Sequence, residues 1–197
     1  VMKGLFVDNI LDNGGYVYKT YKDLDKKALN KYTKALNEQG VRLAPIHKIR
    51  KKKNELVLHQ VKIEGKTLNE FLVNEAIYHS KLSNKAYKVF KKFIKYYFSK
   101  IYTLDGYSVD CKLSNFMLKN FTLVDVVPVL KNSDYNENKN DIKYVCFNKD
   151  AQIKNIITYW LKSFMCFSYN KNKSPLLAVI RDFEKLRKYG IDFIAAP

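Results

Sequence analysis

Cysteine, histidine and glycine are scarce in this sequence, and their scarcity excludes several kinds of site. The 197 residues contain three cysteines, Cys111, Cys146 and Cys166, without a C-x-x-C pair. An odd number of scattered cysteines argues against a disulfide scaffold and against a zinc site. It favours a reducing compartment, so we expect a cytoplasmic protein. The three histidines also lack the spacing of metal ligands.

Long apolar runs and acidic residues are also few. The longest apolar stretch, Ile156–Phe167, is short and is interrupted by Lys162, so we expect neither a transmembrane segment nor a signal peptide. Nineteen acidic residues stand against 36 Lys and Arg, which gives a net charge of +17. This charge implies attraction to polyanions: nucleic acid, anionic lipid, acidic protein or nucleotide. Coding bias of an AT-rich genome is the alternative explanation for part of the lysine excess.

Hydrophobic residues make up 47% of the chain, enough for a packed core in one domain or in two small lobes that share a cleft. A hairpin turn is predicted at residues 12–15, because Asn-Gly and Gly-Gly supply the positive φ that a tight turn needs. In the strand that follows, Lys19 falls on the same face as Val17 and Tyr21. It is therefore either a lysine at the edge of a sheet or a functional cation.

Helices are predicted where apolar residues recur at helical spacing. One covers residues 23–39, with an aspartate as its cap, and a second begins at the capping box of Thr67 and Glu70. The clearest covers 83–102 and sets an apolar face against five lysines, which form a solvated surface or a polyanion-binding one. The other predicted elements are strands at 46–50, 55–63, 116–118 and 123–127 and at Val109, a polar loop at 131–141, and helices at 150–167 and 174–188.

The segment YSVDCKLSNFMLKNFTLVDVVPVL, residues 107–130, places four polar side chains among apolar runs. It is either an ordinary turn or a site for a metal and a phosphate. Phosphoryl transfer needs a carboxylate for the acceptor hydroxyl, a cation beside the phosphate and oxygen ligands for Mg²⁺. Asp110 would supply the carboxylate and Lys112 the cation. Asn115 and Asp125 would hold the metal, brought together by the short hairpin between them.

The pattern Asp-x-Lys-x-x-Asn, followed by a hairpin and a second Asp, resembles the catalytic loop and metal-binding Asp of the protein-kinase-like superfamily. The small bacterial and aminoglycoside-phosphotransferase-like branches are the most similar. YVYKTY resembles the strand that carries the phosphate-binding lysine, here Lys19. Residues 23–39 resemble the helix whose Glu, here Glu38, pairs with that lysine. ELVLHQVKIEGKTLNEFL resembles the last strand of the first lobe, the hinge and the first helix of the second lobe.

The resemblance implies an α+β protein with a compact two-lobed, protein-kinase-like fold. Residues 1–63 would form a small antiparallel-sheet lobe with one helix, and residues 64–197 a reduced, mainly helical lobe. ATP would lie between the lobes, with its adenine at the backbone of Gln60, Val61 and Ile63. Mg²⁺ would be the metal.

The sequence departs from the family pattern at several places. Ser108-Val109 stands where His-Arg usually precedes the catalytic Asp, and Val126-Val127 follows Asp125 where Phe-Gly is usual. No G-x-G-x-x-G loop precedes Lys19, so residues near Asp8-Asn9 would have to cover the phosphates. Without such cover the phosphates would be poorly held. The substitutions at 108–109 and 126–127 leave the chemistry possible and remove the usual means of regulation.

We therefore expect an ATP-dependent phosphotransferase that moves a γ-phosphoryl group to a hydroxyl acceptor, in the first place Ser or Thr of a protein. The positive charge disfavours a cationic acceptor and leaves an acidic partner or nucleic acid open. The alternative is a pseudokinase, a nucleotide-binding or protein-interaction module without turnover. A third hypothesis is a basic nucleic-acid-binding protein.

Overall fold

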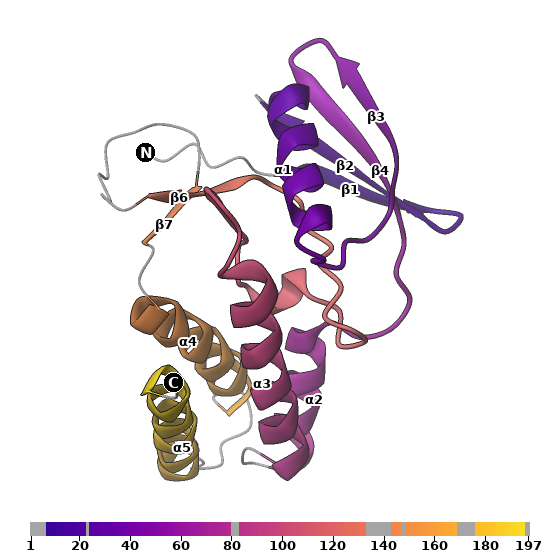
Figure 1. The fold of residues 1–197 in the computed structure, drawn as a ribbon. Coiled ribbons are helices and arrows are strands. Elements are labelled where there is room, and N and C mark those ends of the chain that lie inside the picture. Colours follow the sequence, from indigo (N-terminus) through magenta and orange to yellow (C-terminus); the bar gives the residue numbers. More distant parts are fainter. Residues whose placement is uncertain are drawn as a thin grey trace.

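The computed structural model describes residues 7–22, 24–79, 83–132, 143–146, 149–168 and 176–195, and these residues form an α+β protein. A small antiparallel sheet with helix α1 beside it occupies one end, and the remaining helices gather at the other (Figure 1). The sheet has the order β1-β2-β4-β3 and consists of β1 (Val7–Asn13), β2 (Tyr16–Lys22), β3 (Ile46–Lys52) and β4 (Glu55–Val61). The helices are α1 (Lys26–Glu38), α2 (Leu68–His79), α3 (Asn84–Tyr96), α4 (Lys149–Ser168) and α5 (Leu176–Ala195).

The first hairpin and the first helix follow from local sequence, as predicted. Gly14 and Gly15 occupy the turn between β1 and β2 with φ of +57° and +86°, a region that favours glycine. Asp25 is the cap of α1, since its carboxylate accepts a hydrogen bond of 2.9 Å from the Ala28 N–H. Gly40, with φ of +74°, follows the end of α1.

The helices of the second half also begin at predicted caps. The Thr67 N–H donates to Glu70 at 2.7 Å and the Glu70 N–H donates back to the Thr67 hydroxyl at 3.1 Å, which is the predicted capping box. Ser83 caps α3 from one side only, because its hydroxyl accepts a hydrogen bond of 3.0 Å from the Ala86 N–H. The predicted helix at 83–102 is thus present, but its last part, Tyr97–Ile101, is a π-helical turn.

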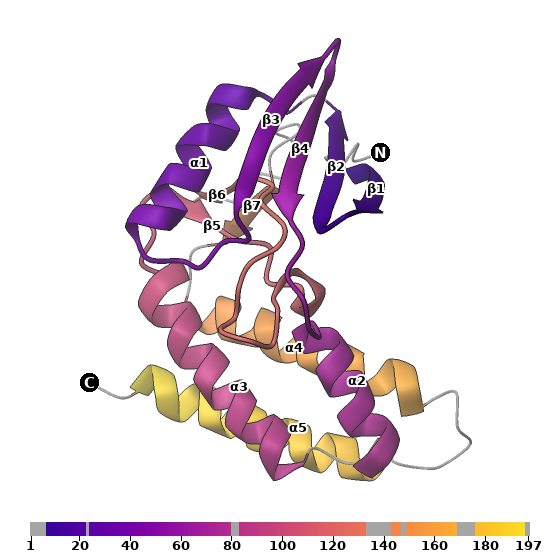
Figure 2. The same ribbon diagram turned by 90° about the vertical axis from the view of Figure 1, so that its right-hand side faces the viewer.

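Two hydrophobic clusters hold the described part of the chain together. The larger one joins α2, α3, α4 and α5 around fully buried aromatic side chains such as Trp160 and Phe90, whose rings meet edge to face at 5.0 Å. The smaller one lies at the sheet and consists of Tyr21, Leu29, Leu56, Leu58, Val126 and Val127. The segment from residue 109 to 128 runs between the sheet and the helices (Figure 2). The residues after Asp125 therefore belong to the core of the sheet region.

Three features differ from the sequence prediction. A second sheet forms from β5 (Tyr107–Ser108), β6 (Val129–Asn132) and β7 (Lys143–Cys146), with β6 and β7 parallel. Val109 is outside any strand, and the expected strands at 116–118 and 123–127 are reduced to isolated bridges, one of them between Phe116 and Leu123. The expected loop at 131–141 begins inside β6, and residues 133–142 lie outside the described part. A parallel pairing between distant segments leaves no local signal.

Among the described residues, no helix has both the length and the apolar character needed to cross a membrane.

The contact between α4 and α5 gives a test of the packing. Gly190 of α5 is buried, and a Cβ at this position would lie 2.5 Å from Cγ2 of Ile153 in α4. Gly→Ala inside a helix ordinarily stabilises by about 1 kcal/mol. Here we expect Gly190→Ala to lower the free energy of unfolding by about 1–3 kcal/mol, because a buried β-branched side chain would have to move.

The measurement is urea unfolding followed by circular dichroism. Lys188→Ala, an exposed position of the same helix, is the control and is expected to change the free energy of unfolding by less than about 0.5 kcal/mol. A Gly190→Ala variant as stable as the wild type would show that α5 does not pack on α4 at this distance.

Candidate functional site

Lys19 lies in the middle of β2, with only 7% of the residue exposed. Its ammonium group donates a hydrogen bond to the backbone carbonyl of Val124, the residue before Asp125. A buried charge is costly unless it is paired and hydrogen-bonded. Burial lowers the pKa of Lys19, and the negative charge of Asp125 opposes that shift. The strand and the segment that carries Asp125 are thus held together by a charge-assisted contact.

Val124 also connects Asp125 to the start of the hairpin. Its backbone N–H donates to the Asn115 carbonyl at 2.9 Å, so Asn115 and Asp125 lie at the same end of the hairpin. The side-chain amide of Asn115 donates in turn to the Asp110 carbonyl at 3.1 Å. Since only the NH₂ end of an amide can donate, the amide oxygen of Asn115 stays available to accept a bond or to bind a cation.

Asp110 and Lys112 form the outer part of this network. The Lys112 ammonium lies 3.4 Å from the Asp110 carboxylate, with the two side chains 53% and 12% exposed. The Lys112 N–H also donates to the same carboxylate at 3.3 Å. An ion pair with one exposed partner is weak, so Lys112 can move to another anion at little cost. Cys111 between them is buried, and burial raises the pKa of its thiol to about 12, which makes a thiolate nucleophile unfavourable.

Asp125 carries an unusual buried oxygen. Its Oδ1 atom and the hydroxyl of Tyr21 are both buried without a hydrogen-bond partner among the described residues. Burial raises the pKa of Tyr21, and Asp125 adds to this effect through its charge and through a side-chain hydrogen bond. The hydroxyl and the carboxylate thus face each other, although their geometry falls short of a regular hydrogen bond. Buried carboxylate oxygens are nearly always paired in proteins. A buried oxygen without a regular hydrogen bond suits a hard cation such as Mg²⁺, which takes oxygen ligands.

The described residues contain no group of three His, Cys, Asp or Glu side chains placed to hold a metal ion. Any cation held by Asp125 and Asn115 would therefore need further oxygen ligands from a bound molecule and from water, as Mg²⁺ usually does.

The structure does not bring Glu38 to Lys19, and this prediction is wrong. Glu38 lies in the last turn of α1 with its side chain 66% exposed, and it pairs with Lys34 at 3.7 Å. The inward face of α1 is occupied by apolar and aromatic side chains instead, among them Leu29 and Tyr32. Spacing along the helix could not place Glu38 correctly, because the inward face is set by packing on the sheet and on the other helices.

Gln60 and Val61 are placed at the end of β4, where the chain leaves the sheet. The Gln60 side chain is buried and its amide donates to the Ala44 carbonyl at 3.1 Å. The Val61 N–H donates to Pro45 at 2.8 Å. Both groups are therefore engaged within the protein, while the half-buried Ile63 shows no such bond among the described residues. If a base binds here, the backbone of Ile63 is the position with free hydrogen-bonding capacity.

Two site residues were missed by sequence reasoning. Tyr32 of α1 is fully buried, and its hydroxyl donates to the Ser108 carbonyl at 2.8 Å, just before the Asp110 loop. Its position in the apolar stripe of the helix predicts that the side chain is buried. It does not predict which group accepts the hydrogen bond of its hydroxyl. The role of Val124 rests on its backbone atoms, for which a sequence carries no signal. The predicted cover near Asp8-Asn9 lies in a strand whose side chains are outside the described part.

Comparison with protein-family models gives no match for this chain, and comparison with curated proteins gives none either.

The unpartnered hydroxyl of Tyr21 leads to a prediction about pH. A tyrosine whose pKa is raised by burial keeps its proton in the folded protein while the unfolded chain loses it above a pH of about 10. The free energy of unfolding therefore has its full value below that pH and falls as the pH rises further. Tyr21→Phe removes one such group. It should reduce the slope of the free energy of unfolding against pH, in the alkaline range, by up to about 1.4 kcal/mol per pH unit.

The free energy of unfolding of Tyr21→Phe and wild type would be measured in urea at neutral and alkaline pH. At pH 7 we expect a loss of less than about 1 kcal/mol, because the contact between the hydroxyl and the Asp125 carboxylate lacks the geometry of a regular hydrogen bond. A larger loss at pH 7, or an unchanged alkaline slope, would show that the hydroxyl is bonded or accessible.

Proposed function

We propose that this chain is an ATP-dependent phosphotransferase with a compact two-lobed, protein-kinase-like fold. One observation carries the proposal. The contacts from Lys19 to Val124, from Val124 to Asn115 and from Asn115 to Asp110 gather the residue types that phosphoryl transfer needs. Residues 1–63 would form the first lobe and 64–197 the second, with ATP between them.

Each residue of the network has a separate role in this proposal. Lys19 would hold the phosphates, since its ammonium has three donors and only one is used on Val124. Asn115 and Asp125 would hold Mg²⁺, which would neutralise charge on the phosphates when bound. Asp110 would orient the acceptor hydroxyl and take its proton. Lys112, which is mostly exposed, would turn from Asp110 toward the transferring phosphate.

The open oxygen of Asp125 supports the metal part of the proposal. A buried carboxylate oxygen without a donor is a cost to the fold unless another group binds it. Together with the amide oxygen of Asn115 it offers the oxygen donors that Mg²⁺ prefers over nitrogen or sulfur.

The acceptor is proposed to be a hydroxyl of Ser or Thr in a protein. A chain with a net charge of +17 repels cationic small molecules and attracts acidic ones. Positively charged acceptors are therefore disfavoured, whereas an acidic protein substrate is compatible with the field around the molecule.

A second function is favoured by one observation: helix α1 places no carboxylate beside Lys19, whose neighbouring negative charge is that of Asp125. Helix α1 supplies the buried Tyr32 but no acidic partner, and Lys19 is bonded to a backbone carbonyl. Such a lysine can bind the phosphates of a nucleotide, but no glutamate of the helix fixes its ammonium group in the position for transfer. This favours a nucleotide-binding or protein-interaction module without turnover.

Binding is tested by thermal unfolding with ATP and Mg²⁺. Ligand at about a hundred times its dissociation constant adds about 2.7 kcal/mol to stability. In a chain of this size we expect the melting temperature to rise by roughly 5–10 °C. Asp125→Asn should lose most of the part that depends on Mg²⁺, while Asp192→Asn, the same change at an exposed position of α5, should keep it. No shift in the wild type would exclude phosphoryl transfer and nucleotide binding, and would leave only the protein-interaction module.

Transfer is tested with radiolabelled ATP and a library of Ser- and Thr-containing peptides. Asp110→Asn should slow transfer by about 10²–10⁴-fold and leave the thermal shift in place, because the carboxylate acts on the acceptor and not on the nucleotide. Asp105→Asn, an exposed aspartate shortly before β5, is the control. Equal rates in the wild type and Asp110→Asn contradict the catalytic assignment. A wild type that binds ATP without transfer supports the second function.

A further inference from the structure

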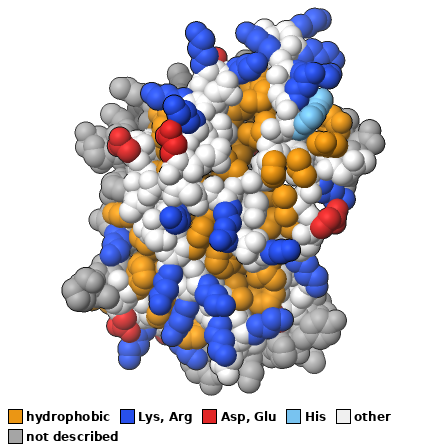
Figure 3. Space-filling view, turned by 45° about the vertical axis from the view of Figure 1, so that its right-hand side comes forward, with side chains coloured by type: hydrophobic (Ala, Val, Ile, Leu, Met, Phe, Trp, Pro, Cys, Tyr) orange, Lys and Arg blue, Asp and Glu red, His pale blue; other side chains and the backbone are white. Residues whose placement is uncertain are grey.

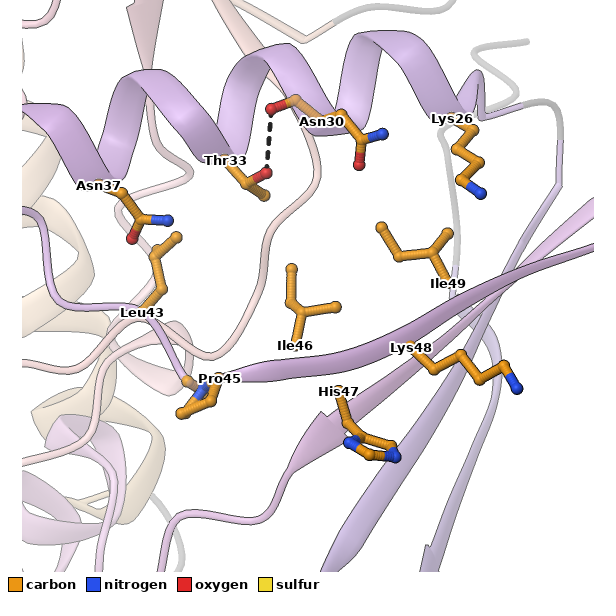
Figure 4. A pocket seen from close by; sticks show the side chains of 11 residues that line it. Lys26, Asn30, Thr33, Asn37, Leu43, Pro45, Ile46, His47, Lys48 and Ile49 are labelled. Carbon is orange, nitrogen blue, oxygen red and sulfur yellow. Dashed lines mark hydrogen bonds between the residues drawn. The ribbon is translucent and has the colours of Figure 1, made fainter.

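A groove of about 630 Å³ lies between α1 and β3, and none of the residues assigned to the Lys19 network lines it (Figure 4). Ile46 and Ile49 point from β3 toward the helix, whereas His47 points to the other side of the strand, where its ring lies 5.3 Å from that of Tyr16. The lining comes from α1 (Lys26, Asn30, Thr33, Asn37), from the segment before β3 (Leu43, Ala44, Pro45) and from β3 itself (Ile46, His47, Lys48, Ile49).

One wall of the groove is the edge of a sheet. In the described part of the chain β3 pairs with β4 alone, so the backbone along its other side has no strand beside it. A free edge is a template for an added strand from another chain. The opposite wall presents side-chain amides from Asn30 and Asn37, which can both donate to and accept from a second backbone.

The floor of the groove is apolar and incompletely covered. Leu43, Ile46 and Ile49 pack against the smaller hydrophobic cluster from one side and remain half-buried. Figure 3 shows an apolar strip in this region of the surface, with Lys and Arg side chains around it. Apolar side chains of an added strand would cover this strip, since alternate residues of a strand point to the same face.

The charge of the groove selects the kind of strand that fits. Lys26 and Lys48 are exposed at its walls, and Arg50 continues the same strand. None of the described residues that line the groove is a carboxylate, and the one acidic residue of α1, Glu38, is paired with Lys34. An acidic segment is therefore attracted and a basic one repelled.

We infer that this groove binds an extended, acidic segment of a partner protein, which adds to the sheet as a strand beside β3. Acidic side chains of the segment meet Lys26 and Lys48, and its apolar side chains cover Ile46 and Ile49. The inference does not depend on the proposed phosphoryl transfer, because its evidence is the edge, the floor and the charge of the groove.

The groove is also connected to the candidate site through backbone bonds. The Ala44 N–H donates to the Leu123 carbonyl at 2.9 Å, and the Leu123 N–H donates to Arg42 at 2.8 Å. Leu123 directly precedes Val124, the partner of Lys19. A strand seated in the groove thus rests on the segment that holds the Lys19 network.

The test begins with the selection of random displayed peptides on the purified full chain. We expect the enriched sequences to alternate Asp or Glu with apolar residues. A fluorescent synthetic copy of the consensus peptide is then titrated at physiological salt. Lys26→Glu combined with Lys48→Glu should weaken binding by roughly tenfold or more. Lys88→Glu combined with Lys92→Glu, the same charge change on α3, should have little effect, because screening is strong beyond about 8 Å.

Two further measurements separate strand addition from general charge attraction. Asn30→Trp, at an exposed helix position, fills the groove and should abolish binding. N-methylation of alternate residues of the peptide should abolish binding in one register and spare it in the other, since only one set of N–H groups faces β3. The proposal is overturned if no acidic peptide is enriched, if the two lysine pairs have equal effects, or if both methylated registers bind.

Discussion

The buried ammonium of Lys19 donates to the carbonyl of Val124, which lies 105 residues further along the chain, and the rest of the candidate site depends on this contact. A buried lysine must be compensated, and the compensation comes from a backbone carbonyl and from the neighbouring charge of Asp125. The N–H of the same Val124 fixes Asn115, whose amide fixes the Asp110 loop. One residue of the hairpin thus connects a strand of the sheet to Asn115 and, through Asn115, to the Asp110 loop.

The residues around the site that differ from the family pattern are buried parts of this chain's own packing. Val126 and Val127 are buried in the cluster beneath the sheet, so apolar side chains are required there. Ser108 is buried, and its carbonyl accepts the hydroxyl of Tyr32, which ties α1 to the start of the loop. In this chain α1 is therefore attached through tyrosine and apolar contacts, and Lys19 does without a glutamate from the helix.

Local sequence predicted most of the elements, because their signals are local. The glycine turn before β2, the Asp25 cap and the Thr67–Glu70 capping box all lie at the positions that the local sequence motifs predict. The grouping of Asn115 with Asp125 also followed from the hairpin between them. The exposed position of Glu38, the π-helical turn at Tyr97 and the parallel pairing of β6 with β7 were not predicted, since spacing and composition carry no signal for them. The groove beside β3 was missed for the same reason.

The central claim is that Lys19, Asn115 and Asp125 converge on one phosphate group and its metal. A crystal structure of the protein with a non-hydrolysable ATP analogue and Mg²⁺ tests this most directly. The account predicts Mg²⁺ at about 2.1 Å from an oxygen of Asp125, with Asn115 as a further ligand and the Lys19 ammonium within hydrogen-bond distance of a phosphate oxygen. A nucleotide bound elsewhere on the basic surface, or a metal that touches neither Asp125 nor Asn115, would contradict it.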